Sequence, residues 1–542
     1  MEIHRAARAS QARFERRRLD YLPWYDGSSS DPCDEIIGRY CFRYGDRDSV
    51  YEPPPDSEPV VRGRDQLITE LSNASRTLPG DQWIAGQRVR YLAEAGRGAE
   101  AEPAAMACRP AGDWWCLALL GYAYHAAGSY ATADSAFAAA LLTMPRDERC
   151  RWTDLSALLD GPLDGYRDAP CEARDSVARR FWWLADPLFI VPGNERRTEH
   201  YSRWVMNRLQ AGAVSPWGYS WSSDQRQILI RFGWPAGWAR PRRTGGGLPD
   251  EWAVSASFRE PQRAYEPPAR FVTSPEAIRP GSWTLVPERP RGGFVPAYAT
   301  RLDSLRYQVA VFRREEGAVV IAGYDLLQDS VAAETPVRAA LSLSSGPDSP
   351  VRATAGRATA RARGVLTLET PAVAGLLSLE ALAPDARRAG RQRFWLPLAP
   401  RPAGRLAVSD VLLLSRADSL PRALDDAAPL ANPSTTVPAG IVGLYWEVYG
   451  LGLGATPYSV GLTVVRESIG FFRRAARAVG LAAGERPQVR LGWTEVSRPD
   501  AGTTGTSVAL DLSSARPGRY TLRLSVSVRG DSAVTERHLT IR

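Results

Sequence analysis

The periodicity of the apolar residues changes close to residue 303, and this change constrains the fold more than any other feature of the sequence. Before it, residues 80–145 and 177–210 repeat their apolar positions at helical spacing. After it, short runs of alternating residues separated by turn residues indicate β-strands. At roughly 150 residues per domain, the chain is long enough for several domains. The sequence therefore predicts a multidomain α+β protein, with helices first and antiparallel β-sandwich units after them.

Residues 114–145 predict two helices in close contact. Small residues at Gly121 and Ala133 would let the helices approach, while Tyr124 and Phe137 fill the space between them. This spacing resembles the tetratricopeptide repeat (TPR), and a looser copy lies one period upstream. Because three or more repeats are usually needed for a free-standing solenoid, we expect these helices to dock on the domain that follows.

A small α+β domain is predicted between these helices and the β-region. Its helical stretch, 177–210, is followed by Ile228, Ile230 and Phe232, whose alternation with their neighbours is typical of a strand. Residues 240–300 are rich in Pro, Gly and Arg and have few periodic runs. We expect them to form a long excursion or linker.

Two groups of strands are predicted after residue 303, separated by a stretch rich in Pro, Ala and Asp from Asp418 to Pro438. The first group opens with a hairpin, and the second closes with strands that alternate strictly. Several strands at this spacing suggest two sandwiches. The predicted strands are Tyr307–Arg313, Ala318–Leu327, Val337–Ser344, Val365–Glu369, Leu376–Leu382, Phe394–Leu398, Leu444–Tyr449, Val460–Arg466, Val489–Val496, Tyr520–Val528 and a final strand carrying Leu539 and Ile541 inward.

The predicted domain boundaries follow these shifts in composition. The opening residues suggest an Arg-rich helix, and residues 22–75 look irregular because they are rich in Pro and Ser. The predicted regions are an irregular, disulfide-tied segment (1–78), TPR-like helices (79–170), a small α+β domain with its excursion (171–300), a first sandwich (301–417), a linker (418–438) and a second sandwich (439–542).

All the cysteines lie in the first third of the chain: Cys33, Cys41, Cys108, Cys116, Cys150 and Cys171. Sequence alone does not fix their connectivity, although the spacing favours three consecutive local pairs. An even, clustered set favours an oxidising compartment, the periplasm or cell surface. The alternative is six reduced thiols in a cytosolic protein. Residues 1–20 contain no apolar core of a signal peptide, so export requires a leader upstream of this start.

The composition excludes several kinds of chemistry. Lys and Arg together number 68 against 60 Asp and Glu, which gives a net charge of +8, and every one of the 68 is arginine. A chain without lysine has no Walker A phosphate loop and no pyridoxal Schiff base. The four histidines are too scattered for a metal site, and we expect no cofactor. No apolar run approaches the ~20 residues of a transmembrane helix. The arginine clusters form no stripe on a recognisable module, so nucleic-acid binding is not expected.

The segment SWSSDQRQILIRFGWP, residues 220–235, resembles the core of the GWxTD domain, whose pattern is roughly GWxTDRGxxYIxxGxP. The positions that match this pattern are Trp221, Asp224, Ile230, Gly233 and Pro235. Ser220 and Ser223 replace the Gly and Thr of the pattern, and Arg226 replaces a second Gly. TPR-like helices before and β-domains after this segment fit the family's usual companions. The resemblance implies an architecture and no activity.

Asp224 is a candidate acid, base or cation ligand. The structural alternative, which we favour, is a turn in which its carboxylate accepts backbone N–H bonds. Glu199 and His200 could form an acid–base pair, but adjacent helical residues point about 100° apart, so a structural role is favoured.

Tryptophan is unusually frequent, since 11 of the 17 tryptophans lie between Trp114 and Trp252. Most would be core fillers. Four of them fall at predicted turns and are the better candidates for a recognition face: Trp217, Trp221, Trp234 and Trp238.

The predicted function is therefore non-catalytic: an extracytoplasmic scaffold that holds a partner protein or peptide through TPR-like and Trp-rich surfaces. One alternative is a protein that binds or hydrolyses cell-envelope carbohydrate, with Asp224 as a working acid. Another is a cytosolic assembly factor, if the cysteines are reduced. The tripeptide Arg529-Gly530-Asp531 is interpreted as a hairpin tip and not as an adhesion motif.

Overall fold

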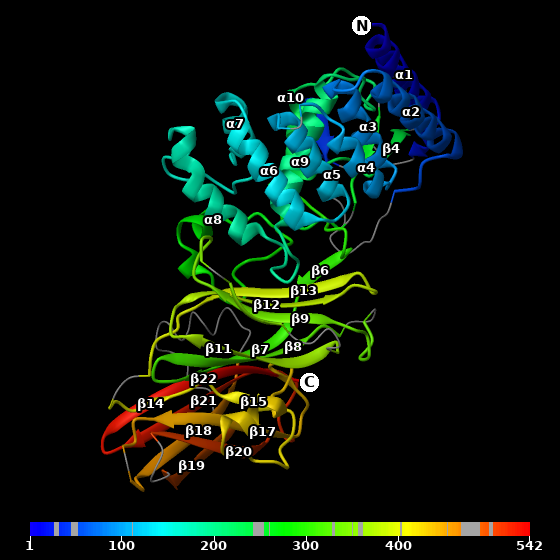
Figure 1. Cartoon of the computed structure of the whole chain (residues 1–542). Coiled ribbons are helices and arrows are strands. Elements are labelled where there is room, and N and C mark those ends of the chain that lie inside the picture. Colours follow the sequence, from blue (N-terminus) through cyan, green and yellow to red (C-terminus); the bar gives the residue numbers. More distant parts are fainter. Residues whose placement is uncertain are drawn as a thin grey trace. The chain divides into compact units, whose positions relative to one another are not determined.

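A computed structural model of the chain divides into two compact units, unit 1 (Met1–Leu302) and unit 2 (Asp303–Arg542). Unit 1 holds most of the helices and unit 2 most of the strands, as the blue-to-green and green-to-red parts of Figure 1 show. The structure describes residues 1–25, 32–44, 53–110, 112–241, 254–259, 261–327, 331–349, 351–355, 361–401, 404–452, 454–467, 488–497 and 502–542. Within these ranges, no helix combines the length and the apolar character needed to span a bilayer.

The helical regions predicted in the first 210 residues are confirmed. The helices described in unit 1 are α1 (Glu2–Asp20), α2 (Glu58–Thr77), α3 (Gln82–Glu94), α4 (Gly98–Met106), α5 (Trp114–Ala126), α6 (Tyr130–Thr143), α7 (Arg146–Thr153), α8 (Asp175–Ala185), α9 (Glu195–Ala211), α10 (Ser223–Phe232) and the short α11 (Ala269–Thr273).

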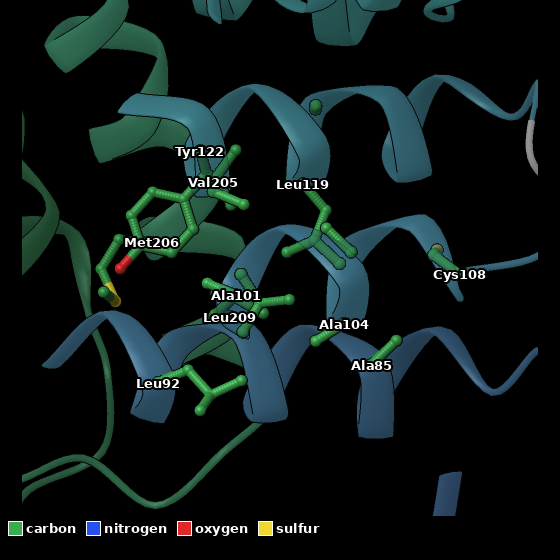
Figure 2. Packing of buried hydrophobic residues seen from close by; sticks show 14 of the residues in the cluster. Ala85, Leu92, Ala101, Ala104, Cys108, Leu119, Tyr122, Val205, Met206 and Leu209 are labelled. Atoms are coloured by element: carbon green, nitrogen blue, oxygen red, sulfur yellow. The ribbon is translucent and has the colours of Figure 1, made fainter. Parts of the chain in front are cut away.

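Helices α5 and α6 pack closely at the predicted position. A Cβ atom added to Gly121 would lie 2.9 Å from the ring of Phe137, so only glycine allows this approach. Helix α9 packs against α3, α5 and α6. Figure 2 shows Val205, Met206 and Leu209 of α9 among the buried side chains of α3, α4 and α5. Helices α3, α5 and α6 therefore pack on α9, which follows them in the chain.

Helix α2 corrects the prediction that residues 22–75 are irregular. Its first turn contains a proline, which suits a helix start because the missing N–H would have no partner there. Only Val60, Leu67, Ile68 and Leu71 are buried. This apolar stripe is narrow, and the proline-rich approach to it masks the helical period in the sequence.

Helix α10 overturns the predicted strand at Ile228–Phe232. A capping box starts the helix, in which the side chains of Ser222 and Gln225 each bond the other residue's backbone. The alternation of Ile228, Ile230 and Phe232 also places the first and last one helical turn apart, on a common face. Arg226 lies inside the helix and therefore needs no left-handed backbone.

The described part of the excursion is packed and not a free linker. Tyr265, Phe271, Val272 and Ile278 are at most 2 % exposed. Strand β4 (Gly237–Pro241) pairs with β1 (Trp24–Tyr25) and with β5 (Ser255–Ser257) in a small sheet. The remainder of the predicted excursion, residues 242–253 and 260, lies outside the described residues.

Unit 2 begins with two sheets that pack on each other, and all the strands predicted there are present. One has the order β10–β9–β12–β13–β6 and the other the order β11–β8–β7. Their strands are β6 (Arg301–Ser304), β7 (Arg306–Arg313), β8 (Gly317–Asp325), β9 (Arg338–Ser344), β10 (Arg352–Ala355), β11 (Arg363–Pro371), β12 (Gly375–Ala383) and β13 (Arg388–Leu396). The pairing is antiparallel along β7–β8 and β12–β13, which are the two hairpins.

The second pair of sheets encloses a core of alternating side chains from β17, β18, β21 and β22. One sheet has the order β14–β17–β15 with β20 also on β17, and the other has the order β16–β22–β21–β18–β19. The strands are β14 (Ala407–Val408), β15 (Leu412–Leu414), β16 (Thr436–Val437), β17 (Ile441–Tyr449), β18 (Pro457–Arg466), β19 (Val489–Val496), β20 (Thr503–Asp511), β21 (Gly518–Val528) and β22 (Asp531–Ile541).

The predicted linker, residues 418–438, is an integral part of this second pair of sheets. It contains the short helix α12 (Leu424–Ala427) and β16, which pairs with the last strand. At the far end, Arg529 and Gly530 both have positive φ and join β21 to β22 as a two-residue turn. The hairpin-tip interpretation of this tripeptide is confirmed.

Candidate functional site

A short hairpin in unit 1, β2 (Glu35–Ile37) and β3 (Tyr40–Phe42), is closed by the Cys33–Cys41 disulfide. We call residues 33–44 the disulfide hairpin. Its buried side chains pack on α10, where the rings of Phe42 and Phe232 stack with centroids 3.9 Å apart. Ile228 and Phe232 of α10 therefore form the surface on which the disulfide hairpin packs.

The turn of the disulfide hairpin lies against Asp224, in the first turn of α10. Arg39 Nε donates to Asp224 Oδ2 at 2.8 Å, and Arg39 Nη2 donates to Ser222 Oγ at 2.8 Å. Gly38 has φ +57°, and a Cβ added there would lie 2.4 Å from Asp224 Cβ. Although burial opposes ionisation, hydrogen bonds from Ser222 and Arg39 hold the pKa of Asp224 below its usual value. The carboxylate thus fastens the hairpin turn.

The other end of the disulfide hairpin is held by Glu35 and Arg231. Arg231 donates two hydrogen bonds to the Glu35 carboxylate, at 2.6 and 2.8 Å, and its side chain is 1 % exposed. This bidentate pairing lowers the pKa of Glu35 to about 2. Tyr44 also donates to Glu35, and burial raises the pKa of the Tyr44 hydroxyl to about 12. At neutral pH, Glu35 is therefore ionised and the Tyr44 hydroxyl is neutral.

A cavity of about 70 Å³ opens beside this ion pair, and we call it the hairpin cavity. Its lining comes from three distant parts of unit 1: the end of the hairpin, Phe258 with residues 261–264, and the segment from Leu285 to Gly292. Three aromatic rings and three prolines make up much of the lining: Phe42, Tyr44, Phe258, Pro261, Pro287 and Pro290. Arg43, Gln262, Arg263 and Glu288 contribute polar atoms.

The four tryptophans predicted to form a recognition face come together in one cluster. Ring centroids are 4.7 Å apart for Trp217 and Trp238, 5.5 Å for Trp234 and Trp238, and 6.4 Å for Trp221 and Trp234. Trp217 and Trp238 are buried, whereas Trp221 and Trp234 are half-buried. Tyr40 of the hairpin lies 5.8 Å from Trp217, ring to ring. The tryptophan cluster therefore contacts the disulfide hairpin through Tyr40.

Glu199 and His200 have separate partners. His200 is fully buried and donates from Nε2 to the carbonyl of Trp152 at 2.8 Å, and burial lowers its pKa to about 3. Glu199 lies 2.7 Å from Arg203 Nε and 2.9 Å from His125 Nε2. Neither residue faces the other as an acid–base pair, and both join elements of the core.

The three predicted disulfides are present: Cys33–Cys41, Cys108–Cys116 and Cys150–Cys171. No cysteine is free. The described residues include no group of three or more His, Cys, Asp or Glu side chains placed to hold a metal ion.

Sequence reasoning found Asp224, the cysteines and the tryptophans but missed the cavity. Glu35 and Arg231 are 196 residues apart, and no local pattern connects them. The available signal was the aromatic content of the cysteine-bounded segment, in which Tyr40, Phe42 and Tyr44 alternate.

No protein-family model matches the chain, and no curated protein sequence matches it. Among solved structures, red sea bream transglutaminase aligns at 10 % identity with a TM-score of 0.14, over 44 % of this chain and 31 % of that one. A putative β-galactosidase from Bacteroides fragilis aligns at 8 % identity and TM-score 0.15, over 43 % and 34 % of the two chains. Escherichia coli α-2-macroglobulin aligns at 14 % identity and TM-score 0.14, over 44 % and 23 %. Likenesses this low carry no argument about fold or function.

Proposed function

We propose that this chain is an extracytoplasmic, non-catalytic binding protein that holds a segment of a partner polypeptide in the hairpin cavity. The observation that carries the proposal is the cavity lining, in which aromatic rings and prolines from three segments of unit 1 converge. A concave, mainly apolar site with a few polar groups is the usual form of a binding site.

The size of the hairpin cavity favours one anchoring side chain over a whole small molecule. Its volume of about 70 Å³ is roughly half that of a protein cavity that holds benzene. A ring of proline size fits this space. Partner proteins commonly gain most of their affinity from one or two such anchors inserted in a pocket.

The chemistry of the walls favours an extended, proline-containing segment. Aromatic grooves bind proline-rich segments because their left-handed helix is already ordered before binding. Phe42, Tyr44 and Phe258 supply the aromatic faces. The TPR-like helices are a less suitable surface, because α9 packs on α3, α5 and α6.

The carboxylates that hold the disulfide hairpin support a role without catalysis. Asp224 is engaged by Arg39, and Glu35 by Arg231. A general acid active at neutral pH requires a raised carboxyl pKa, whereas both of these pKa values are lowered. The two carboxylates are therefore suited to hold the hairpin in place.

The three disulfides support an oxidising, extracytoplasmic location. We also propose that α8–α10 and the turns around them form a GWxTD-like domain, with α5 and α6 as a TPR-like pair. Supporting this, two positions that match the GWxTD pattern lie at the ends of α10: Asp224 is in its first turn, and Gly233 is its C-cap with φ +90°.

The test uses the full oxidised chain and a short fluorescent peptide of alternating alanine and proline, compared with an all-alanine peptide. Val286→Phe would fill the cavity from a lining position, and Val61→Phe is the matched control on the exposed face of α2. We expect Val286→Phe to weaken binding of the proline peptide at least about tenfold. Val61→Phe should leave it unchanged.

Equal binding of the proline peptide by the unmodified chain and by Val286→Phe would refute the proposal. A carbohydrate panel, read by tryptophan fluorescence, covers the alternative class of ligand. A saturable shift with a sugar that disappears in Val286→Phe would replace the polypeptide partner with a carbohydrate.

A further inference from the structure

The three disulfides differ sharply in exposure. Cys108 and Cys116 are 1 % and 4 % exposed and lie in the helical core, whereas Cys33 and Cys41 are both exposed. These two bonds have the same sequence separation, 8 residues, so loop length does not distinguish them. The two bonds differ in how easily a reducing thiol can reach them, and this matters because exchange requires direct attack on a sulfur atom.

The exposed disulfide closes the element that forms one wall of the hairpin cavity. Phe42 and Tyr44 line the cavity and follow Cys41 directly. Strands β2 and β3 have three residues each, and an isolated hairpin of this size is barely stable in water. The covalent bond therefore contributes a large part of what keeps this wall in place.

The noncovalent attachments of the disulfide hairpin are partly wet. Arg39 is 48 % exposed in its pair with Asp224, and a pair with this access to water contributes little stability. The bidentate pair of Glu35 with Arg231 is drier, since the two side chains are 27 % and 1 % exposed, and it is the stronger of the two. The stacked rings of Phe42 and Phe232 and the buried Ile37 supply most of the remaining attachment.

We propose that Cys33–Cys41 is a thiol–disulfide exchange site for a dithiol, and that its reduction releases the hairpin and opens the cavity wall. The exchange site does not depend on the proposed function. Only the expected effect on peptide binding rests on the proposed function.

The exchange moves two electrons from the dithiol to the protein. One thiolate of the dithiol attacks the sulfur of Cys33 or Cys41, which forms a mixed disulfide and releases the other cysteine as a thiolate that takes up a proton. The second thiol of the reagent then attacks the mixed disulfide. The protein ends with two thiols, and the reagent ends as its own disulfide.

The first test measures reduction of the native full chain by dithiothreitol, with pulse alkylation and mass spectrometry of each cysteine. We expect Cys33 and Cys41 to be alkylated at least about tenfold faster than Cys108 and Cys116, because the first two residues are exposed and the other two are buried. A smaller ratio would overturn the assignment. The two bonds are an internal matched pair, since they enclose loops of equal length.

The second test measures amide hydrogen exchange in the disulfide hairpin. In Cys33→Ser/Cys41→Ser, exchange at Ile37 and Tyr40 should rise at least about tenfold, which reports local opening. Cys150→Ser/Cys171→Ser is the control and should leave these amides unchanged. Unchanged exchange in the first variant would show that the bond does not hold the wall, and would overturn the proposed release.

A third measurement separates this inference from the proposed function. Binding of the alanine–proline peptide should fall at least about tenfold on reduction of Cys33–Cys41. If the peptide binds the oxidised and reduced forms equally, the coupling is wrong. If it binds neither form, the proposed function fails, while the alkylation and exchange results still decide the redox site.

Discussion

Two N-terminal elements of unit 1, helix α1 and the disulfide hairpin, are both attached by arginine–carboxylate pairs, yet the pairs differ in their access to water. Glu15 and Arg18 of α1 alternate with Arg90 and Glu94 of α3, and their side chains are between 0 and 9 % exposed. In the hairpin, by contrast, the side chain of Arg39 is 48 % exposed, and the second pair joins the buried Arg231 to Glu35, which is 27 % exposed.

This difference determines how easily each element can leave. Burial opposes ionisation of Glu94, but Arg90 and Arg18 outweigh it and keep its pKa at about 2. We call Glu15, Arg18, Arg90 and Glu94 the dry set, because their side chains are nearly inaccessible to water. Removing one charge from the dry set leaves another charge buried without a partner. Water can replace a lost partner at the exposed Arg39 of the hairpin. We therefore infer that α1 stays packed in the native protein, whereas the hairpin can be released when the Cys33–Cys41 disulfide is reduced.

The largest effect is expected for Arg90→Met, which removes one cation from the dry set. Glu15 and Glu94 would then share Arg18 alone, and we expect the free energy of unfolding to fall by about 3–5 kcal/mol. Urea unfolding of the oxidised chain, followed by circular dichroism, measures this loss.

Arg97→Met is the matched control, because Arg97 pairs with Asp65 and Glu100 at the surface. It should cost at most about 1 kcal/mol. If the free energy of unfolding fell equally in Arg90→Met and Arg97→Met, buried and exposed ion pairs would not differ in their contribution to stability.

A smaller, local effect is expected for Gly38→Ala. The new Cβ would meet Asp224 Cβ at 2.4 Å, and φ +57° is itself unfavourable for alanine by about 1–2 kcal/mol. Hydrogen exchange at the hairpin amides should accelerate while α3 and α5 keep their protection. Gly128→Ala isolates the backbone cost, because φ is +77° there and nothing lies within 4 Å. If both variants leave the hairpin amides equally protected, the close approach to Asp224 is not what positions the turn.

Local patterns predicted the parts of this architecture that depend on neighbours in sequence. The closely packed α5–α6 pair follows from Gly121 and Phe137, and the closing strand β21 follows from strict alternation. The three disulfides follow from cysteine spacing. In each case the deciding partners are close along the chain.

The errors arise where distant partners decide the structure. Ile228 and Phe232 fit both a strand and one face of a helix, and the capping box together with the disulfide hairpin selects the helix. Likewise, Trp217 and Trp238 were expected at an exposed face, but they pack on each other and on Leu22. The pairing of Glu15 with Arg90 spans 75 residues and leaves no trace in local spacing.

As the pH falls, we expect the free energy of unfolding of unit 1 to decrease, through His200, before the disulfide hairpin becomes less stable. The pKa of His200 is about 3 in the fold against 6.5 in the unfolded chain, because burial disfavours the imidazolium. The unfolded state therefore binds a proton first, and stability is lost as pH falls below 6.5. We expect a loss of about 2 kcal/mol between pH 7 and pH 5.

His200→Gln should reduce this slope, since glutamine cannot gain a charge, and urea unfolding at the two pH values measures it. The pKa of Glu35 is lowered from 4.5 to about 2, so the stability it contributes is lost only below about pH 4.5. Hairpin exchange, corrected for the intrinsic pH dependence, should therefore stay constant between pH 7 and pH 5. An unchanged slope in His200→Gln would contradict the assignment to His200.

The smallest effect is expected for Asp224→Asn, which removes the charge that Arg39 pairs with but keeps an oxygen for the hydrogen bond. Because Arg39 is 48 % exposed, we expect the hairpin opening equilibrium to shift by at most about 1 kcal/mol. Raising the salt concentration to about 1 M should produce a similar shift in the unmodified chain and almost none in the variant, since salt screens exposed pairs. A loss as large as that of Arg90→Met would mean that this pair behaves as if it were dry. The hairpin would then be attached in the same way as α1, and the basis for its conditional release would disappear.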